Sequence, residues 1–87
     1  MFVILTYDVG QKRVSKVMKT CRRYLLHVQN SVFEGTITSA RLSKLKEELA
    51  DIIEKENDRV CIYKFDSIKY SSKEQIGAVY DYDSIIA

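Results

Sequence analysis

The feature that most restricts the fold is the alternation of two helix-like segments with short runs of β-forming residues within 87 residues. Residues 2–7 (FVILTY) are almost continuously apolar, which predicts a central strand buried on both faces. Residues 11 to about 26 repeat apolar side chains at helical spacing, and residues 39–53 do the same after Ser39, a predicted N-cap. A chain of this length forms one domain, so these elements must share one core.

Further strands complete the order. Residues 27–37 have strand character, with Gly35 as a bulge or turn, so they form either one bent strand or a tight pair. In residues 60–65, alternation places the side chains at 61, 63 and 65 on one face. A polar stretch, residues 68–75, separates these from a short C-terminal strand at about residues 77–83.

The order β-α-β(β)-α-β-β predicts an α+β fold with two helices on one face of a mostly antiparallel sheet. This is the ferredoxin-like β-α-β-β-α-β sandwich with an extra C-terminal strand, in a single domain over residues 1–87. The small core favours a homodimer, in which the extra strand returns to its own sheet or pairs with an edge of the partner. The fold alone does not decide a function.

Several classes are excluded by composition. The N-terminus lacks the pattern of a signal peptide, and no apolar run reaches a membrane-spanning length. Cys21 and Cys61 lack the spacing of metal ligands and are predicted to be free, buried thiols in a reducing compartment. We therefore expect a cytoplasmic protein without membrane partners. The one histidine, His27, is predicted on a strand surface, which disfavours a histidine-based nuclease.

Asp8 ends the first apolar run and has two interpretations. It can cap the following helix, because Asp is a preferred N-cap and Gln11 stands three residues on, as in a capping box. It can also be a functional carboxylate, because the C-terminal end of a central strand lies at the rim of the sheet. Mg²⁺ takes one or two carboxylates and keeps several waters, and a two-fold dimer would bring a second Asp8 to the same ion.

Basic residues gather in the first helix. Six Lys and Arg residues and no acidic residue lie between Gly10 and Phe33. Four of them recur at i, i+4, i+7 and i+11 on one face, and Arg13 adjoins them; the four are Lys12, Lys16, Lys19 and Arg23. The ordinary alternative is a solvated helix face, but such faces usually carry both positive and negative side chains. The pattern favours salt-dependent, sequence-independent binding to nucleic-acid phosphates.

Three motifs together resemble a known family. TYDV at residues 6–9 ends the first strand, KRVSKV at residues 12–17 opens the basic helix, and VQNSVFEG follows at residues 28–35. Across essentially the whole chain, this pattern resembles the Cas-two family of small CRISPR-associated adaptation proteins. The chain departs from the family at His27, where a basic residue is frequent, and at residues 24–26, where a Tyr-Gly turn is frequent.

The resemblance implies a ferredoxin-like homodimer that exchanges its C-terminal strands. It implies a role in spacer acquisition, bridging two dimers of the CRISPR integrase and supporting double-stranded DNA. It also implies metal-dependent endonuclease activity on RNA or DNA, with Asp8 of each protomer as the catalytic residue and ligand of one shared Mg²⁺. Tyr7 and Phe33 would shape this site, and the motif's basic positions are Lys12, Arg13 and Lys16.

Four functions therefore stay open at the level of sequence. A nucleic-acid scaffold needs the basic helix but not Asp8 chemistry, whereas a magnesium-dependent phosphodiesterase needs Asp8 from both chains. A related ribonuclease toxin of similar fold would be toxic on expression and would have no integrase partner. A ferredoxin-like regulatory domain would show no salt-sensitive affinity for duplexes. We expect any cleavage to require metal and to fall at acid pH.

Overall fold

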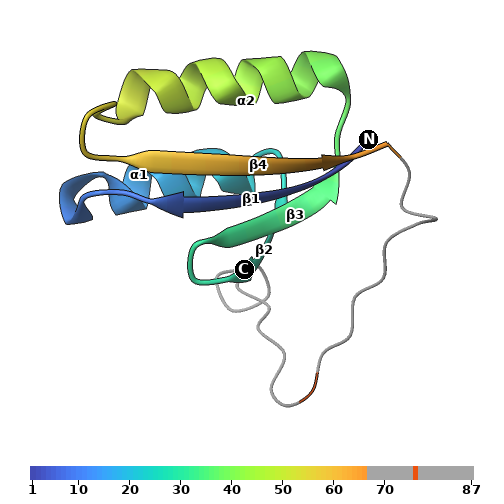
Figure 1. The fold of residues 1–87 in the computed structure, drawn as a ribbon, viewed down its shortest axis with the longest axis horizontal. Helices are drawn as coiled ribbons and strands as arrows, with labels where there is room; N and C mark the ends of the chain where they lie inside the picture. The colour runs from blue at the N-terminus through green and yellow to red at the C-terminus, as the bar shows by residue number, and fades with distance from the viewer. Residues whose placement is uncertain (67–75, 77–87) are drawn as a thin grey trace.

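The computed structural model describes residues 1–66 and residue 76. Four strands and two helices follow one another in the order β-α-β-β-α-β, which confirms the predicted ferredoxin-like α+β fold (Figure 1). The predicted C-terminal strand and the polar stretch before it lie outside the described residues. The elements are β1 (Phe2–Asp8), α1 (Gln11–Arg22), β2 (Leu26–Gln29), β3 (Val32–Thr36), α2 (Ser39–Ile52) and β4 (Arg59–Phe65).

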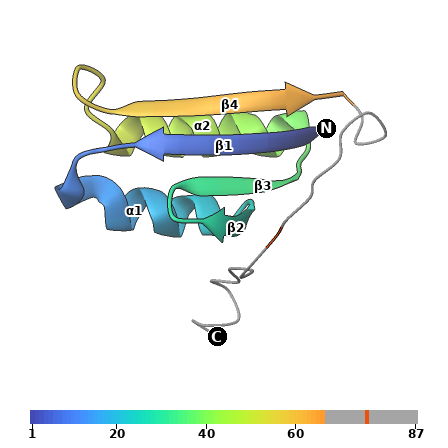
Figure 2. The ribbon, with the colours of Figure 1, turned by 60° about the horizontal axis from the view of Figure 1, so that its bottom comes forward.

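The sheet has the order β2-β3-β1-β4, and each neighbouring pair is antiparallel. β1 is therefore central, as predicted, with Leu5 opposite Phe33 of β3 and Ile62 of β4. Both helices cover the same face of the sheet (Figure 2). The other face carries no helix among the described residues.

The core lies between the sheet and the helices. In β1, Val3, Leu5 and Tyr7 point into it and are buried. Helix α2 contributes Leu42, Leu45 and Leu49, as its spacing predicted. The prediction that β1 is buried on both faces is wrong, because its alternate residues are only half-buried in the chain by itself.

The face of the sheet without helices, here called the open face, is partly apolar. Leu26 and Tyr63 are 50% and 56% exposed on it, and the rings of Phe2 and Phe65 lie 6.1 Å apart. The alternation predicted for β4 is confirmed, because its odd-numbered residues pair with the outward residues of β1. The residues of the open face are Phe2, Ile4, Thr6, Asp8, Leu26, Val32, Glu34, Thr36, Arg59, Cys61, Tyr63 and Phe65.

Two helix boundaries differ from the predictions. Helix α1 ends at Arg22 rather than near residue 26, because the chain must turn before β2 begins at Leu26. The N-cap of α2 is Thr38, whose hydroxyl accepts a hydrogen bond from Arg41 N at 3.2 Å. Ser39, the predicted cap, is the first helical residue. The helix ends at Ile52, one residue before the end of the predicted segment 39–53.

Residues 27–37 form the tight pair rather than one bent strand. β2 and β3 are antiparallel and are joined by a turn at residues 30–31. The irregularity in their pairing falls between His27 and Gln29, and not at Gly35, which pairs regularly with Val3. No helix in the described part of the chain is long and apolar enough to span a membrane.

Candidate functional site

Asp8 is the last residue of the central strand and is exposed on the open face. Its neighbour Tyr7 points the opposite way, into the core, because side chains alternate along a strand. Within residues 1–66 and 76, no side-chain hydrogen bond or ion pair engages the Asp8 carboxylate. Both of its oxygens are therefore available to a ligand.

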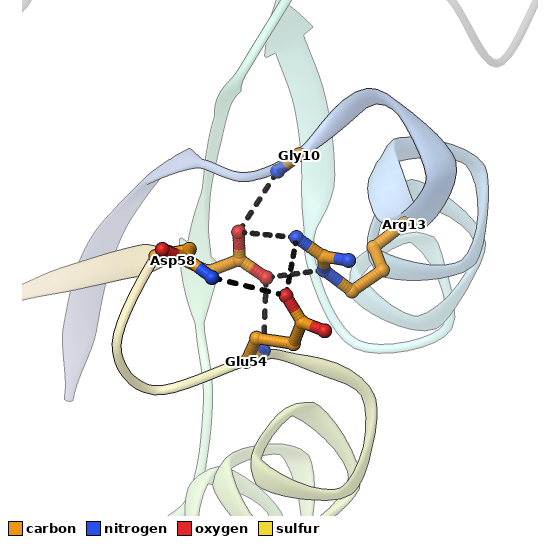
Figure 3. A network of polar contacts seen from close by, with 5 residues as sticks. Gly10, Arg13, Glu54 and Asp58 are labelled. Carbon is orange, nitrogen blue, oxygen red and sulfur yellow. Dashed lines mark hydrogen bonds and ion pairs between the residues drawn. The ribbon is translucent and has the colours of Figure 1, made fainter.

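The prediction that Asp8 caps the first helix is wrong. The N-cap of α1 is Gly10, which has no side chain to donate or accept. Instead, the Gly10 amide donates to Asp58 Oδ1 at 2.8 Å, from the start of β4 (Figure 3). Asp8 cannot serve here because it precedes the cap by two residues and belongs to the strand's outward face. A distant acid therefore binds the amide of the N-cap residue, and Asp8 takes no part in this contact.

Asp58 is the centre of a partly buried polar network, here called the Asp58 clamp (Figure 3). Its side chain is fully buried and accepts hydrogen bonds from Arg13 Nε at 2.5 Å, Arg13 Nη2 at 3.0 Å and Glu54 N at 2.9 Å. The hydrogen bonds from Arg13, and then those from the backbone, hold the pKa of Asp58 well below its usual range, against the opposing effect of burial. The clamp ties the start of α1 to the start of β4.

Two of the five basic residues predicted to bind nucleic acid have acidic partners. Arg13 is neutralised by Asp58 and also lies 3.3 Å from Glu54. Arg23 follows α1 as its C-cap, and its Nη2 lies 2.5 Å from Glu48 Oε1 of α2. Although no acidic residue lies between Gly10 and Phe33, both arginines therefore have acidic partners, because packing brings in acids that are distant in sequence.

The three lysines among these five basic residues have no acidic partner within the described part of the chain. Lys12, Lys16 and Lys19, here called the lysine stripe, are exposed along α1 and form no ion pair with any described residue. Lys16 and Lys19 also border a shallow hollow of about 320 Å³ beside Arg23. The lysine stripe is the part of the predicted basic surface that remains open to an anion.

Tyr7 and Phe33 lie on the core side of the sheet. Tyr7 is 7% exposed, its hydroxyl lies 3.4 Å from Asn30 O, and its ring stacks at 6.2 Å on that of Phe33. Phe33 is fully buried and stacks at 4.2 Å on His27. The predicted surface position of His27 is wrong, since it is 1% exposed. These rings pack against the core side of the sheet, opposite the face on which Asp8 lies.

Asp8 borders two hollows. One, of about 350 Å³, lies on the side of α1 and the turn between β2 and β3, and is lined mainly by Tyr7, Val14, Met18 and His27. The other, of about 260 Å³, lies on the open face. Its lining residues are Thr6, Tyr7, Asp8, Arg59, Cys61 and Tyr63.

Arg59 is a residue of this site that the sequence analysis missed. It begins β4 and lies directly opposite Asp8 in the antiparallel register. The alternation of residues 60–65 extends to position 59 and would have placed it on the same face as Cys61. Its pairing with Asp8 depends on the register of two strands that are fifty residues apart, which a single sequence does not display.

The donor set at Asp8 suits a hard, hydrated cation. Among the described residues, no three His, Cys, Asp or Glu side chains gather as a metal centre. One exposed carboxylate fits Mg²⁺, which keeps several waters and takes one or two protein carboxylates. Among the described residues, neither hollow beside Asp8 contains a second carboxylate, and a second copy of the chain is one source of it.

Neither cysteine takes part in a disulfide, as predicted. Cys21 is buried in the core, and its burial raises the pKa of the thiol to about 12. Cys61 is only half-buried on the open face, so the prediction of burial holds for Cys21 alone. The Cys21 thiol is therefore unreactive at neutral pH.

Comparison with known proteins gives consistent matches. A family model described as CRISPR associated protein Cas2 matches residues 1–73. A CRISPR-associated endoribonuclease Cas2 of Dictyoglomus turgidum is 47% identical over 88% of each chain. A CRISPR-associated endonuclease Cas2 of Halalkalibacterium halodurans is 43% identical over 90% of this chain and 88% of the other.

A solved structure gives the same result. The crystal structure of Streptococcus pyogenes Cas2 at pH 6.5 superposes with a TM-score of 0.75 and 34% identity, over 88% of this chain and all of that one. The agreement covers both the sequence and the arrangement of strands and helices. The chain belongs to the Cas2 family of CRISPR-associated proteins.

Proposed function

We propose that the chain is a homodimeric nucleic-acid-binding protein of CRISPR adaptation that cleaves phosphodiester bonds with Mg²⁺ at Asp8. The observation that carries this proposal is Asp8 itself, an exposed carboxylate at the end of the central strand without a hydrogen-bonding role in the described fold. Relatives named endoribonuclease and endonuclease support a phosphodiester substrate.

A dimer through the open face would supply the second carboxylate that the described part of one chain does not place beside Asp8. Leu26 and Tyr63 are exposed there and would be buried by a second copy. Burying apolar area contributes about 25 cal/mol per Å², so an uncovered apolar face on a small domain favours association. A two-fold axis near the end of β1 would bring the two Asp8 carboxylates together.

In such a dimer, the lysine stripe would bind the nucleic acid and the paired Asp8 residues would carry out the cleavage. The lysine stripe binds backbone phosphates without reading bases. The paired Asp8 carboxylates hold Mg²⁺, which when bound supplies positive charge to a phosphate oxygen and makes its water more acidic. Hydrolysis adds a water oxygen to phosphorus and breaks one P–O ester bond. The electron pair of that bond leaves with the sugar oxygen, which ends protonated by a proton from the water.

A scaffold in spacer acquisition is the second candidate function. It is favoured by the lysine stripe, whose three uncompensated charges lie on α1 and do not depend on Asp8. In this role the dimer would support double-stranded DNA and bridge two dimers of the CRISPR integrase. Both functions use the same dimer, so one protein can carry both.

Cleavage of labelled single-stranded RNA and double-stranded DNA tests the proposal. We expect the wild type to cut one of them in Mg²⁺, and Asp8→Ala, confirmed as a dimer, to lose at least about 100-fold in rate. Excess chelator should abolish wild-type cleavage. Equal cleavage by the variant or in chelator would refute the Asp8 chemistry. If the wild type binds duplexes but cuts neither substrate, the scaffold function alone is retained.

A further inference from the structure

We propose that Arg59 is a further substrate-binding residue of this site, and that its guanidinium binds a non-bridging oxygen of the phosphodiester held at Asp8. This inference rests on the proposed function and extends it, because it names the group that contacts the substrate phosphate. The sequence motifs discussed above do not include Arg59. The argument uses the register of the sheet, the shared hollow and the partners of the other arginines.

The register places Arg59 beside Asp8. The two residues are directly opposite each other at the end of the β1–β4 pair, and both are exposed on the open face. Side chains in such a cross-strand pair have Cβ atoms about 5 Å apart. Both residues line the same hollow of about 260 Å³. An anion bound there through a cation on Asp8 would therefore lie within reach of the guanidinium.

Arg59 also differs from the other arginines in its partners. Arg13 is bound by Asp58, and Arg23 is bound by Glu48. Arg41 donates to Arg23 O at 3.2 Å and lies 4.8 Å from the centre of the Tyr24 ring. Arg22 is also engaged. Within residues 1–66 and 76, Arg59 is the arginine for which no acidic or aromatic partner is present.

The Asp58 clamp keeps the two strand ends in place. Asp58 immediately precedes Arg59, and it accepts a hydrogen bond at 2.8 Å from Gly10, two residues after Asp8 (Figure 3). The same carboxylate is fixed by Arg13 and by the Glu54 amide. A buried, multiply bonded anchor between the two segments limits how far Asp8 and Arg59 can separate. The pair is therefore preorganised before a substrate arrives.

An arginine suits this place chemically. Its planar guanidinium can donate two parallel hydrogen bonds to a phosphate, which a lysine cannot. Positive charge at a phosphodiester is most valuable when negative charge develops on the oxygens during hydrolysis. A single such donor typically changes the rate by about 100-fold. Arg59 would thus complement the two carboxylates, which alone would repel the substrate.

Binding in Ca²⁺ tests the phosphate contact separately from cleavage in Mg²⁺, because Ca²⁺ also takes oxygen ligands and would hold the phosphate at Asp8. The affinity for a short fluorescein-labelled single-stranded RNA is measured by anisotropy against salt concentration for wild type, Arg59→Gln and Arg59→Lys. We expect Arg59→Gln to bind several-fold more weakly, and its log-affinity slope against log salt to be about 0.7 less steep, which corresponds to one phosphate contact on a single strand. Arg59→Lys should keep most of the slope. Lys46→Gln, which removes one exposed charge on α2, should match the wild type.

Cleavage in Mg²⁺ completes the test. We expect Arg59→Gln to reduce the rate about 100-fold, and Arg59→Lys to recover only part of it. An unchanged slope for Arg59→Gln would overturn the Arg59 proposal while leaving the Asp8 proposal standing. If the wild type binds RNA but does not cleave it, the nuclease function fails, and the slope still decides whether Arg59 contacts phosphate. A wild type without salt-dependent affinity would overturn both.

Discussion

At the residue scale, the sequence suggested that Asp8 caps the first helix, but another aspartate binds the residue that begins it. Asp8 has the sequence pattern of a helix cap, yet the acid that accepts a hydrogen bond from the N-cap residue Gly10 is Asp58, which immediately precedes β4. Because Asp58 binds the Gly10 amide, Asp8 is available for a different role. The outcome depends on tertiary packing, because the register of β1 with β4 decides which acid reaches the Gly10 amide.

The Asp58 clamp makes stability depend on acid. The pKa of Asp58 is lower in the folded chain than in the unfolded chain, so its contribution is complete above about pH 4, the unfolded value, and is lost as pH falls below it. We expect urea denaturation to show lower stability of Asp58→Asn at pH 7, and a smaller loss between about pH 5 and pH 2 than in the wild type. Glu56→Gln, an exposed control, should keep the wild-type profile. Identical profiles for Asp58→Asn and wild type would contradict the clamp.

At the scale of elements, local patterns predicted which segments are helices and strands, but not where they end. The spacing of Leu42, Leu45 and Leu49 predicted α2 and its buried face correctly. The apolar spacing in α1 continued to Leu25, which is indeed buried, although the helix has already ended. The spacing of apolar residues indicates which side chains face the core. A buried loop residue such as Leu25 can continue that spacing beyond the end of the helix.

The N-terminus of α2 offers a matched pair of variants. Thr38→Ala removes the hydroxyl that accepts a hydrogen bond from the Arg41 amide. Loss of such a cap lowers the free energy of unfolding by about 1 kcal/mol. Ser39→Ala changes a neighbouring hydroxyl inside the first turn and should alter stability much less. Chemical denaturation of both variants measures the difference. A larger loss for Ser39→Ala would place the cap at the position that sequence alone favoured.

The lysine stripe is the second property of an element that can be tested. Changing Lys12, Lys16 and Lys19 together to Gln should make the log-log salt dependence of duplex DNA binding less steep by up to about 2.7, for three phosphate contacts. The control changes Lys44, Lys46 and Lys55 to Gln, which removes the same charge from outside α1. Equal effects of the two triple variants would show that net charge alone, rather than the stripe, governs binding.

The basic residues show what a single sequence leaves out. Their spacing on α1 was correctly visible, but the acids that neutralise Arg13 and Arg23 come from segments twenty-five or more residues away in sequence. Arg59 was missed for the same reason, since its place beside Asp8 follows from strand pairing. Local chemistry could be predicted from sequence, whereas the partners of each charged group required the fold.

At the scale of the whole molecule, the partly apolar open face accounts for a feature of β1 that the described fold of one chain leaves unexplained. Its apolar run is continuous, although the helices bury only every second residue. The alternate residues, Phe2 and Ile4, face the same way as Asp8. A dimer through the open face would bury them and complete the Asp8 site at once.

A charge placed on the open face should separate the protomers. Tyr63 of β4 is 56% exposed on this face and pairs with Ile4 of the central strand β1. We expect Tyr63→Glu to keep the circular dichroism of the wild type but to sediment with the mass of one chain, and to lose Mg²⁺-dependent cleavage. Lys46→Glu on α2 should remain a dimer. A Tyr63→Glu variant that stays dimeric would show that the open face is not the interface.

The central claim is that one cation is held between the Asp8 residues of two chains, and counting bound Mn²⁺ tests it most directly. Mn²⁺ prefers the same oxygen ligands as Mg²⁺ and is visible by electron paramagnetic resonance. The account predicts one tightly bound Mn²⁺ per two wild-type chains, and none in Asp8→Asn at unchanged dimer mass. One ion per chain, or equal binding by Asp8→Asn, would contradict it.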